Sequence, residues 1–219
     1  MKRRETKMWE RIEGFMFSPS VTFRASKGET FSDALKYYVP LLVIFSVLFA
    51  VVTAAILTNS MVLGILTGIS GMLPEACPVG LLLTILGQFN MLTLGGGLFI
   101  GALMGGIIGI LILGIWVHIW AYAFGGRRGL TQTIKALMYG STPFLIFGWI
   151  PGLDIIGAIW AILVIPTGLI ELQEMYSGRT ILALIFALVV PMIIAGAIAA
   201  AFVLSMLEGA YSFSYAIKI

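Results

Sequence analysis

The chain has 219 residues, of which 60% are hydrophobic and 11% are charged, and its formal net charge is +3. Soluble domains carry about a quarter charged residues, so this composition excludes an ordinary soluble domain and indicates an integral membrane protein. No charged residue occurs between Tyr37 and Pro74 or between Cys77 and Gly126, and each run exceeds the roughly 20 apolar residues that one membrane-spanning helix needs. The runs do not alternate between apolar and polar residues, which excludes a transmembrane barrel. We therefore expect an all-α, polytopic membrane protein.

Residues 1–36 form a basic segment that we expect on the cytoplasmic side. Apolar residues recur there at helical spacing around Trp9, Ile12 and Phe15, which indicates an amphipathic helix. On the inner leaflet such an interfacial helix would contact anionic headgroups through its basic residues, which are Arg3, Arg4, Lys7 and Arg11. The alternative is a helix packed on the cytoplasmic face of the bundle. Further on, Thr30 and Asp33 resemble a capping box that begins a helix leading into the first span.

The apolar segments of residues 37–219 predict five transmembrane helices in one bundle. The predicted spans are residues 38–57, 97–123, 134–150, 155–172 and 180–206. Short cytoplasmic loops collect Lys and Arg, and five spans with a cytoplasmic N-terminus place 12 basic residues inside and one, Lys218, outside. A sixth span within residues 81–94 would change this division to 9 against 4. We therefore predict five spans in the cell membrane, with the N-terminus cytoplasmic and the C-terminus external.

Residues 58–96 then lie outside as an apolar loop. Glycine and proline are frequent in this segment, which argues against a regular lipid-facing helix. Irregular backbone at membrane depth needs protein or water around it. We expect a cap packed on the bundle, and the alternative is a segment that re-enters the membrane and lines a vestibule.

Four glycines at intervals of four residues mark the second span: Gly97, Gly101, Gly105 and Gly109. They share one helix face, which we call the glycine ridge, because four residues advance a helix by little more than one turn. A ridge without side chains lets another backbone approach closely. We expect a neighbouring span of the same chain to pack there, and a second copy of the chain is the alternative.

His118 is the only histidine and lies about 10 Å from the end of the second span, seven residues before Gly125. An ionisable group at this depth is a functional hypothesis. The polar residues that could share an intramembrane site with it are Tyr122, Glu171 and Glu174. One hypothesis is a proton relay or a group that titrates with pH. The alternative is a neutral imidazole hydrogen-bonded to a tyrosine or a backbone carbonyl, with both glutamates salt-bridged or solvated at a helix end.

The loop GGRRGLT follows the second span and carries Arg127 and Arg128, with Lys135 shortly after. It lacks the spacing of a phosphate-binding loop and follows no strand. We expect these three cations to contact lipid phosphate or an acidic partner at the cytoplasmic interface. We find no pair of nucleophile and base, and a single cysteine and a single histidine do not make a metal site. We therefore assign no catalytic residue, metal or cofactor.

Several segments resemble a known family when they are taken in order. They are FMFSPSVTF, YYVPLL, TIKALMYGSTPF, WIPGL and IWAILVIPTGLIELQEMYSGRT. This order is similar to the Yip family of five-span membrane proteins (the Rab-interacting group in eukaryotes), and in particular to its archaeal and bacterial branch. The resemblance implies a five-helix bundle with a cytoplasmic N-terminus and supplies no catalytic residues. The DLYGP signature of the eukaryotic branch is absent, so binding of prenylated GTPases is not carried over.

We therefore expect a non-enzymatic integral membrane protein that organises membrane or binds a partner as a scaffold. Its partners would be the bilayer with its anionic headgroups, another membrane or peripheral protein, or a second copy of the chain, and not nucleic acid. The main alternative is a small-molecule or ion transporter or channel with His118 in the pathway. A third hypothesis is an enzyme acting on lipids through Glu171 and Glu174.

Overall fold

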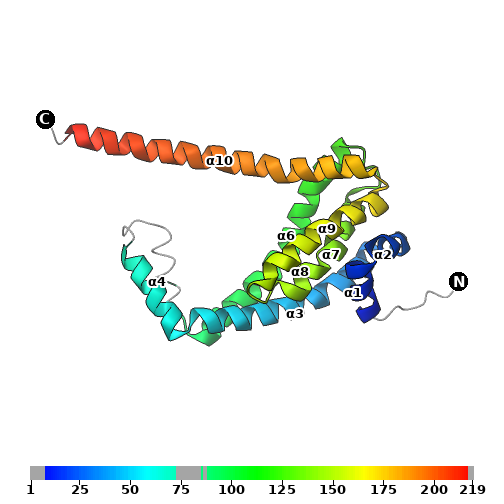
Figure 1. Ribbon diagram of the computed structural model, residues 1–219, viewed down its shortest axis with the longest axis horizontal. Helices are drawn as coiled ribbons and strands as arrows, with labels where there is room; N and C mark the ends of the chain where they lie inside the picture. Colours follow the sequence, from blue (N-terminus) through cyan, green and yellow to red (C-terminus); the bar gives the residue numbers. More distant parts are fainter. Residues whose placement is uncertain (1–7, 73–84, 86–87, 217–219) are drawn as a thin grey trace.

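The computed structural model describes residues 8–72, 85 and 88–216, with side chains through residue 205. The regular secondary structure of these residues is entirely α-helical (Figure 1). The helices are α1 (Met8–Phe17), α2 (Pro19–Ala25), α3 (Phe31–Leu57), α4 (Ser60–Met72), α6 (Met91–Ala123), α7 (Leu130–Gly140), α8 (Thr142–Phe147), α9 (Leu153–Gln173) and α10 (Ser177–Ala216). The all-α fold that the composition predicts is confirmed.

Among the described helices, four are long and apolar enough to cross a membrane, namely α3, α6, α9 and the part of α10 that ends at Ser205. They coincide with the first, second, fourth and fifth predicted spans. The third predicted span, residues 134–150, is not a single helix but the shorter pair α7 and α8. The structure therefore confirms a multi-pass helical protein and does not confirm the count of five spans.

The break between α7 and α8 lies at Ser141, next to a proline. Pro143 has no N–H, so the carbonyl of Tyr139 loses its helical donor. The hydroxyl of Thr142 donates to that carbonyl at 2.6 Å, and the hydroxyl of Tyr37 lies 3.0 Å from the Thr142 hydroxyl. Residues 133–140 are all buried, among α3, α6 and α9. A broken helix is tolerated at membrane depth when protein surrounds it and satisfies its freed backbone groups.

The central helices approach closely at three glycines. Gly106 faces Leu42 of α3, Gly114 faces Ile134 of α7, and Gly140 faces Ile165 of α9. A Cβ atom at any of these positions would lie less than 3 Å from the facing side chain. Helices in lipid are held together largely by such close packing, so these glycines set the spacing of α3, α6, α7 and α9.

The glycine ridge is not part of this packing. No described residue of the chain lies within 4 Å of a Cβ built at any of its four glycines. The ridge is therefore open in this arrangement, and the packing of a neighbouring span on it stays a prediction. The reason is visible in Figure 1, where the second half of α10 diverges from α6.

The two N-terminal helices lie against the bundle. Ile12, Phe15 and Met16 of α1 and Phe23 of α2 are buried in the main hydrophobic core, whereas Trp9 is 72% exposed. This arrangement matches the packed alternative and gives no support to a helix that lies freely on the inner leaflet. The capping box of Thr30 and Asp33 is present at the start of α3, as predicted.

The segment expected to form an external cap begins with a regular helix. α4 follows α3 closely and has no buried residue, and it projects from the end of the bundle in Figure 1. It packs only weakly, against the end of α3. The described part of 58–96 thus differs from a cap packed on the bundle. Residues 73–84 and 86–87, where a re-entrant piece would have to continue, lie outside the described residues.

Candidate functional site: the charged end of the bundle

One end of the bundle is formed by α1 and α2, the end of α6, the start of α7, the end of α9 and the start of α10 (Figure 1). We define the charged end as residues 8–36, 124–135 and 171–179. Twelve of the 13 lysines and arginines lie in these segments or in residues 1–7, together with seven of the ten carboxylates. All lysines and arginines of the described residues, and most of their carboxylates, are therefore at one end of the bundle, and the candidate site is there.

Lys135 is buried inside this end. Its side chain is 0% exposed, and its Nζ donates to the backbone carbonyls of Glu29 at 2.7 Å, Ser26 at 3.3 Å and Lys27 at 3.4 Å. Carbonyls at a helix C-terminus lack helical donors and attract a positive charge, and Ser26 is the residue that ends α2. Lys135 thus joins α7 to the end of α2 and has no exposed surface for a headgroup, contrary to the expectation from sequence.

Arg11 is held in an aromatic cage. Its guanidinium lies 4.9 Å from the ring centroid of Tyr37 and 5.4 Å from that of Tyr139, at distances typical of cation–π contacts. The same group pairs with Glu29 at 2.8 Å, and the Tyr139 hydroxyl donates to that carboxylate. The Arg11 side chain is only 19% exposed. It therefore ties α1 to α3 and α7 rather than reaching toward lipid. Arg3, Arg4 and Lys7 lie outside the described residues.

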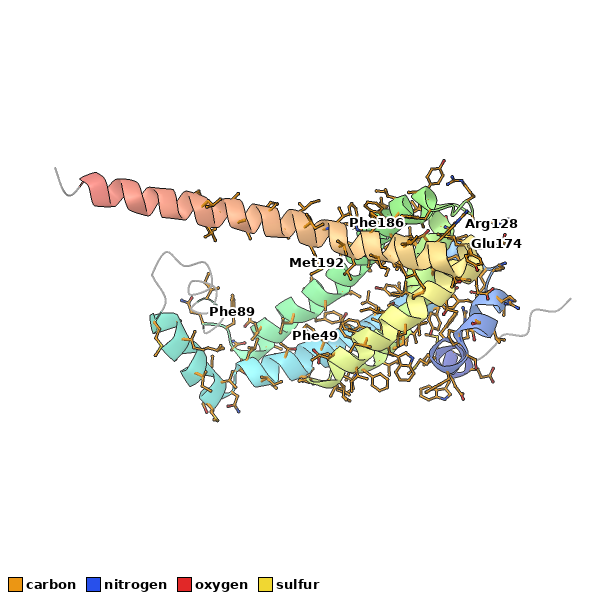
Figure 2. All side chains as sticks on the ribbon, turned by 45° about the horizontal axis from the view of Figure 1, so that its top comes forward. Phe49, Phe89, Arg128, Glu174, Phe186 and Met192 are labelled. Atoms are coloured by element: carbon orange, nitrogen blue, oxygen red, sulfur yellow. The ribbon has the colours of Figure 1, made fainter. Side chains whose placement is uncertain are left out.

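Ion pairs connect α2, the loop after α6 and the end of α9. Arg24 donates to Glu171 at 2.9 Å, and Glu174 accepts from Lys27 at 2.8 Å and from Nε of Arg128 at 2.8 Å. Arg128 and Glu174 are labelled in Figure 2. Lys27 and Arg128 lower the pKa of Glu174, and Glu171 raises the pKa of Arg24. Both glutamates are thus bound in salt bridges, which leaves the lipid-enzyme hypothesis without a free acid or base.

His118 belongs to a chain of hydrogen bonds that ends in the same loop. The backbone N–H of Arg128 donates to Oε1 of Gln173 at 2.9 Å, which fixes the orientation of the amide. Nε2 of Gln173 then donates to the carbonyl of Gly129 at 2.7 Å and to Oγ1 of Thr133 at 2.8 Å. Oγ1 of Thr133 lies 2.9 Å from Nδ1 of His118.

The direction of this chain favours one neutral tautomer of His118. Thr133 already accepts from Gln173, so its own hydroxyl proton is available to Nδ1 of His118. The imidazole is then neutral, with its proton on Nε2. This is the hydrogen-bonded alternative expected from sequence, with a threonine in place of a tyrosine or a carbonyl. Tyr122 lies one turn away, its ring centroid 6.3 Å from that of His118, and neither glutamate contacts the imidazole.

Sequence reasoning missed Thr133 and Gln173. A signal for Gln173 existed in the pattern of α9: it lies four residues after Leu169 and next to Leu172, both of which are buried. A polar amide on the buried face of a helix requires partners there. Thr133 carried no comparable signal, because threonine near a helix start is equally common as a solvated residue.

Three exposed cations remain at the charged end without a carboxylate partner among the described residues: Lys36, Arg127 and Arg179. Arg127 donates to the carbonyl of Tyr122 at 2.6 Å and stacks at 4.0 Å from the centroid of that ring. Arg179 begins α10 and lies beside Gly125, since its Nη1 is 3.2 Å from the position of a Cβ there. Arg127 and Arg179 therefore flank the same glycine turn with their charge uncompensated.

The hollows on the surface lie away from this chemistry. A groove of ≈ 490 Å³ runs between α3 and α6 and is lined by apolar residues and glycines from Val47 to Ala54 and from Met91 to Phe99. A second hollow of ≈ 330 Å³ follows α9 between Ile156 and Leu163. Neither is lined by His118, Glu171 or Glu174, so these hollows give the transporter alternative no support.

Long apolar helices with the charges collected at one end define an integral membrane protein of the helical-bundle class. The sequence matches the family model of the Yip1 domain over residues 14–212. The chain therefore belongs to the Yip1 domain family, whose members are generally non-enzymatic membrane proteins. The family resemblance noted from the sequence is confirmed. Comparisons with curated proteins and with solved structures give no significant match.

Proposed function

We propose that this protein is a non-enzymatic membrane scaffold whose charged end is its contact surface for anionic lipid headgroups. The observation that carries the proposal is a pair of exposed arginines near the Gly125 turn, Arg127 and Arg179, neither of which has a carboxylate partner among the described residues. A guanidinium presents donors that match phosphate oxygens. Each lies at the end of a long apolar helix, where headgroups are within reach. Basic side chains that do hold the charged end together are Arg11, Arg24, Lys27, Arg128 and Lys135, through the contacts described above.

The same charge distribution supports the orientation. All eight lysines and arginines of the described residues lie at the charged end, which agrees with a cytoplasmic position for it. In this arrangement α7 and α8 cross the membrane together as one broken helix. Residues 130–147 would extend about 27 Å at 1.5 Å per residue, close to the thickness of the hydrocarbon core. The N-terminus is then cytoplasmic and the C-terminus external.

A measurement of lipid selectivity tests the proposal. The full chain is reconstituted in phosphatidylcholine vesicles with spin-labelled phosphatidylglycerol or spin-labelled phosphatidylcholine, and the motionally restricted fraction is measured by electron paramagnetic resonance. We expect enrichment of the anionic lipid that weakens with added salt and falls in the double variant Arg127→Gln/Arg179→Gln. Lys218→Gln is the matched control and should leave the enrichment unchanged. Equal enrichment in the double variant and the parent chain would refute the headgroup role.

A further inference from the structure

The second half of α10 and the glycine ridge of α6 are two surfaces that the described bundle leaves without partners. Side chains along α10 are highly exposed, with Ile194 at 51%, Ile198 at 65% and Phe202 at 60%. Figures 1 and 2 show that α10 runs clear of α3 and α6 beyond Met192. On α6, the space over Gly101, Gly105 and Gly109 is open.

The first half of α10 already packs on α6. Ala183 of α10 is buried in one cluster with Ala121 of α6, and Phe186 lies against Trp120, with ring centroids 5.3 Å apart. Nε1 of Trp116 donates to the carbonyl of Ala187 at 2.8 Å. This contact fixes the register of two antiparallel helices at a known pair of residues, Trp116 and Ala187.

The register places the exposed α10 residues level with the ridge. Both helices rise 1.5 Å per residue, so equal steps from Trp116 toward the start of α6 and from Ala187 along α10 reach the same depth. A step of seven residues pairs Gly109 with Ile194, and a step of eleven pairs Gly105 with Ile198. A step of fifteen pairs Gly101 with Phe202.

The paired residues also face each other. Seven, eleven and fifteen residues are close to two, three and four helical turns at 3.6 residues per turn. Gly109, Gly105 and, less centrally, Gly101 therefore continue the face of α6 that carries Trp116. Ile194, Ile198 and Phe202 likewise continue the face of α10 that carries Ala187. Gly196, nine residues after Ala187, lies on the opposite face of α10.

We propose that α10 closes onto α6 of the same chain, so that Ile194, Ile198 and Phe202 pack on Gly109, Gly105 and Gly101. Branched side chains against glycine allow close backbone approach, which is the main source of helix association in lipid. The motion extends an interface that already exists and keeps its register. It is independent of the lipid-headgroup role of the charged end.

Pro191 supplies the hinge for this closure. It lies four residues after Ala187 and has no N–H, so it removes the helical donor to the Ala187 carbonyl. Trp116 provides the replacement donor, and the contact therefore holds α10 on α6 up to the hinge. Prolines are the usual cause of sharp bends in helices, and the divergent half of α10 begins directly after this residue.

A closed helix of the same chain is favoured over a second copy because the covalent connection keeps α10 beside the ridge. The end of the established contact, Ala187, is only seven residues from Ile194. A tethered partner acts at a high effective concentration and does not depend on the amount of protein in the membrane.

Cysteine cross-linking in membranes tests the proposal. Cys77, the only native cysteine, is replaced by Ser, and the pair Gly105→Cys/Ile198→Cys is introduced into the full chain. We expect a disulfide within one chain after mild oxidation, identified by mass spectrometry of the linked peptides. The matched control Gly105→Cys/Gly196→Cys lies at nearly the same depth but on the opposite face of α10, and it should not cross-link. Ala121→Cys/Ala183→Cys reports the contact already present and should cross-link in every preparation.

Each outcome of the cross-linking experiment either supports the closed position of α10 or contradicts it. A disulfide within the chain at Gly105/Ile198, absent at Gly105/Gly196, establishes the closed state. A disulfide-linked dimer on a non-reducing gel assigns the ridge to a second copy and overturns the proposal. Failure to cross-link at Gly105/Ile198 while Ala121/Ala183 forms its disulfide also overturns it. As a second variant, Gly109→Leu added to the Gly105/Ile198 pair should lower the yield several-fold, because the leucine fills the space into which Ile194 packs.

Discussion

Nζ of Lys135 lies 2.7 Å from the backbone oxygen of Glu29, and through this contact a buried lysine of α7 holds the turn that follows α2. The lysine also reaches the carbonyls of Ser26 and Lys27. This turn also carries Lys27, which forms an ion pair with Glu174. Lys135, which the sequence predicted at the surface, is therefore buried inside the charged end.

Lys135→Met should lower the free energy of unfolding by about 2–3 kcal/mol, because methionine fills the space but donates no hydrogen bond to the carbonyls of Lys27 and Glu29. Steric trapping or SDS titration in bicelles measures this change. Lys36→Met is the control, and as an exposed substitution it should change stability by no more than about 0.5 kcal/mol. Equal effects at the two positions would show that Lys135 does not cap α2.

Trp116 and Pro191 should be energetically coupled through the carbonyl of Ala187. In the parent chain Trp116→Phe removes the donor to that carbonyl. In a Pro191→Ala background the helix can supply its own N–H, so the same substitution should cost less, by about 1 kcal/mol. The double-mutant cycle is measured as unfolding free energy in bicelles. A coupling energy of zero would contradict the role of Trp116 as the replacement donor.

His118 should be a neutral imidazole that carries its proton on Nε2, because the Thr133 hydroxyl accepts from Gln173 and lies 2.9 Å from Nδ1, where it can donate. Nitrogen-15 NMR of selectively labelled histidine in bilayers distinguishes the two ring nitrogens. In Thr133→Val the donor is lost, and the two neutral tautomers should approach the ratio of free imidazole. Observation of a proton on Nδ1 in the parent chain would reverse the assigned direction of the hydrogen-bond chain.

Glu174 should make the attachment of α2 to α9 sensitive to acid. Lys27 and Arg128 lower its pKa below the ordinary 4.5, so the ion pairs stabilise the fold fully above that pH. The stabilisation is lost as the pH falls through the lower pKa of the folded state. Hydrogen exchange of the α2 amides should therefore accelerate in this acid range. Glu174→Gln should exchange faster already at neutral pH and lose this part of the pH dependence, while the exposed Glu13→Gln should behave like the parent chain.

The features that the sequence predicted well depend on local patterns. Continuous apolar runs locate α9 to within two residues at each end and α6 at its last residue, although α6 begins six residues before the predicted span. The Thr30–Asp33 spacing identifies the start of α3. These signals lie within single segments, where hydropathy and capping chemistry act without tertiary context. The family assignment rests on the same kind of linear pattern.

The features that the sequence did not predict depend on contacts between segments that are distant along the chain. At the break, the Thr142 hydroxyl donates to the freed carbonyl of Tyr139, and Tyr37 of α3 contacts that hydroxyl. The sequence does not show that Tyr37 lies there. Lys135 resembles a surface cation until the carbonyls that follow α2 are placed around it. Likewise, four spaced glycines indicate close packing, but the pattern alone does not identify the helix that approaches them.

The central claim is that the chain crosses the membrane five times and that its charged end is cytoplasmic. The side of the membrane that holds the turn between α8 and α9 tests this claim most directly. In a Cys77→Ser background, Arg127→Cys and Leu153→Cys are labelled in intact cells with a membrane-impermeant maleimide, and again after permeabilisation. We predict that Leu153→Cys reacts from outside and that Arg127→Cys reacts only after permeabilisation. Reaction of both positions from the same side would show that α7 and α8 do not cross the membrane and would contradict the five-span account.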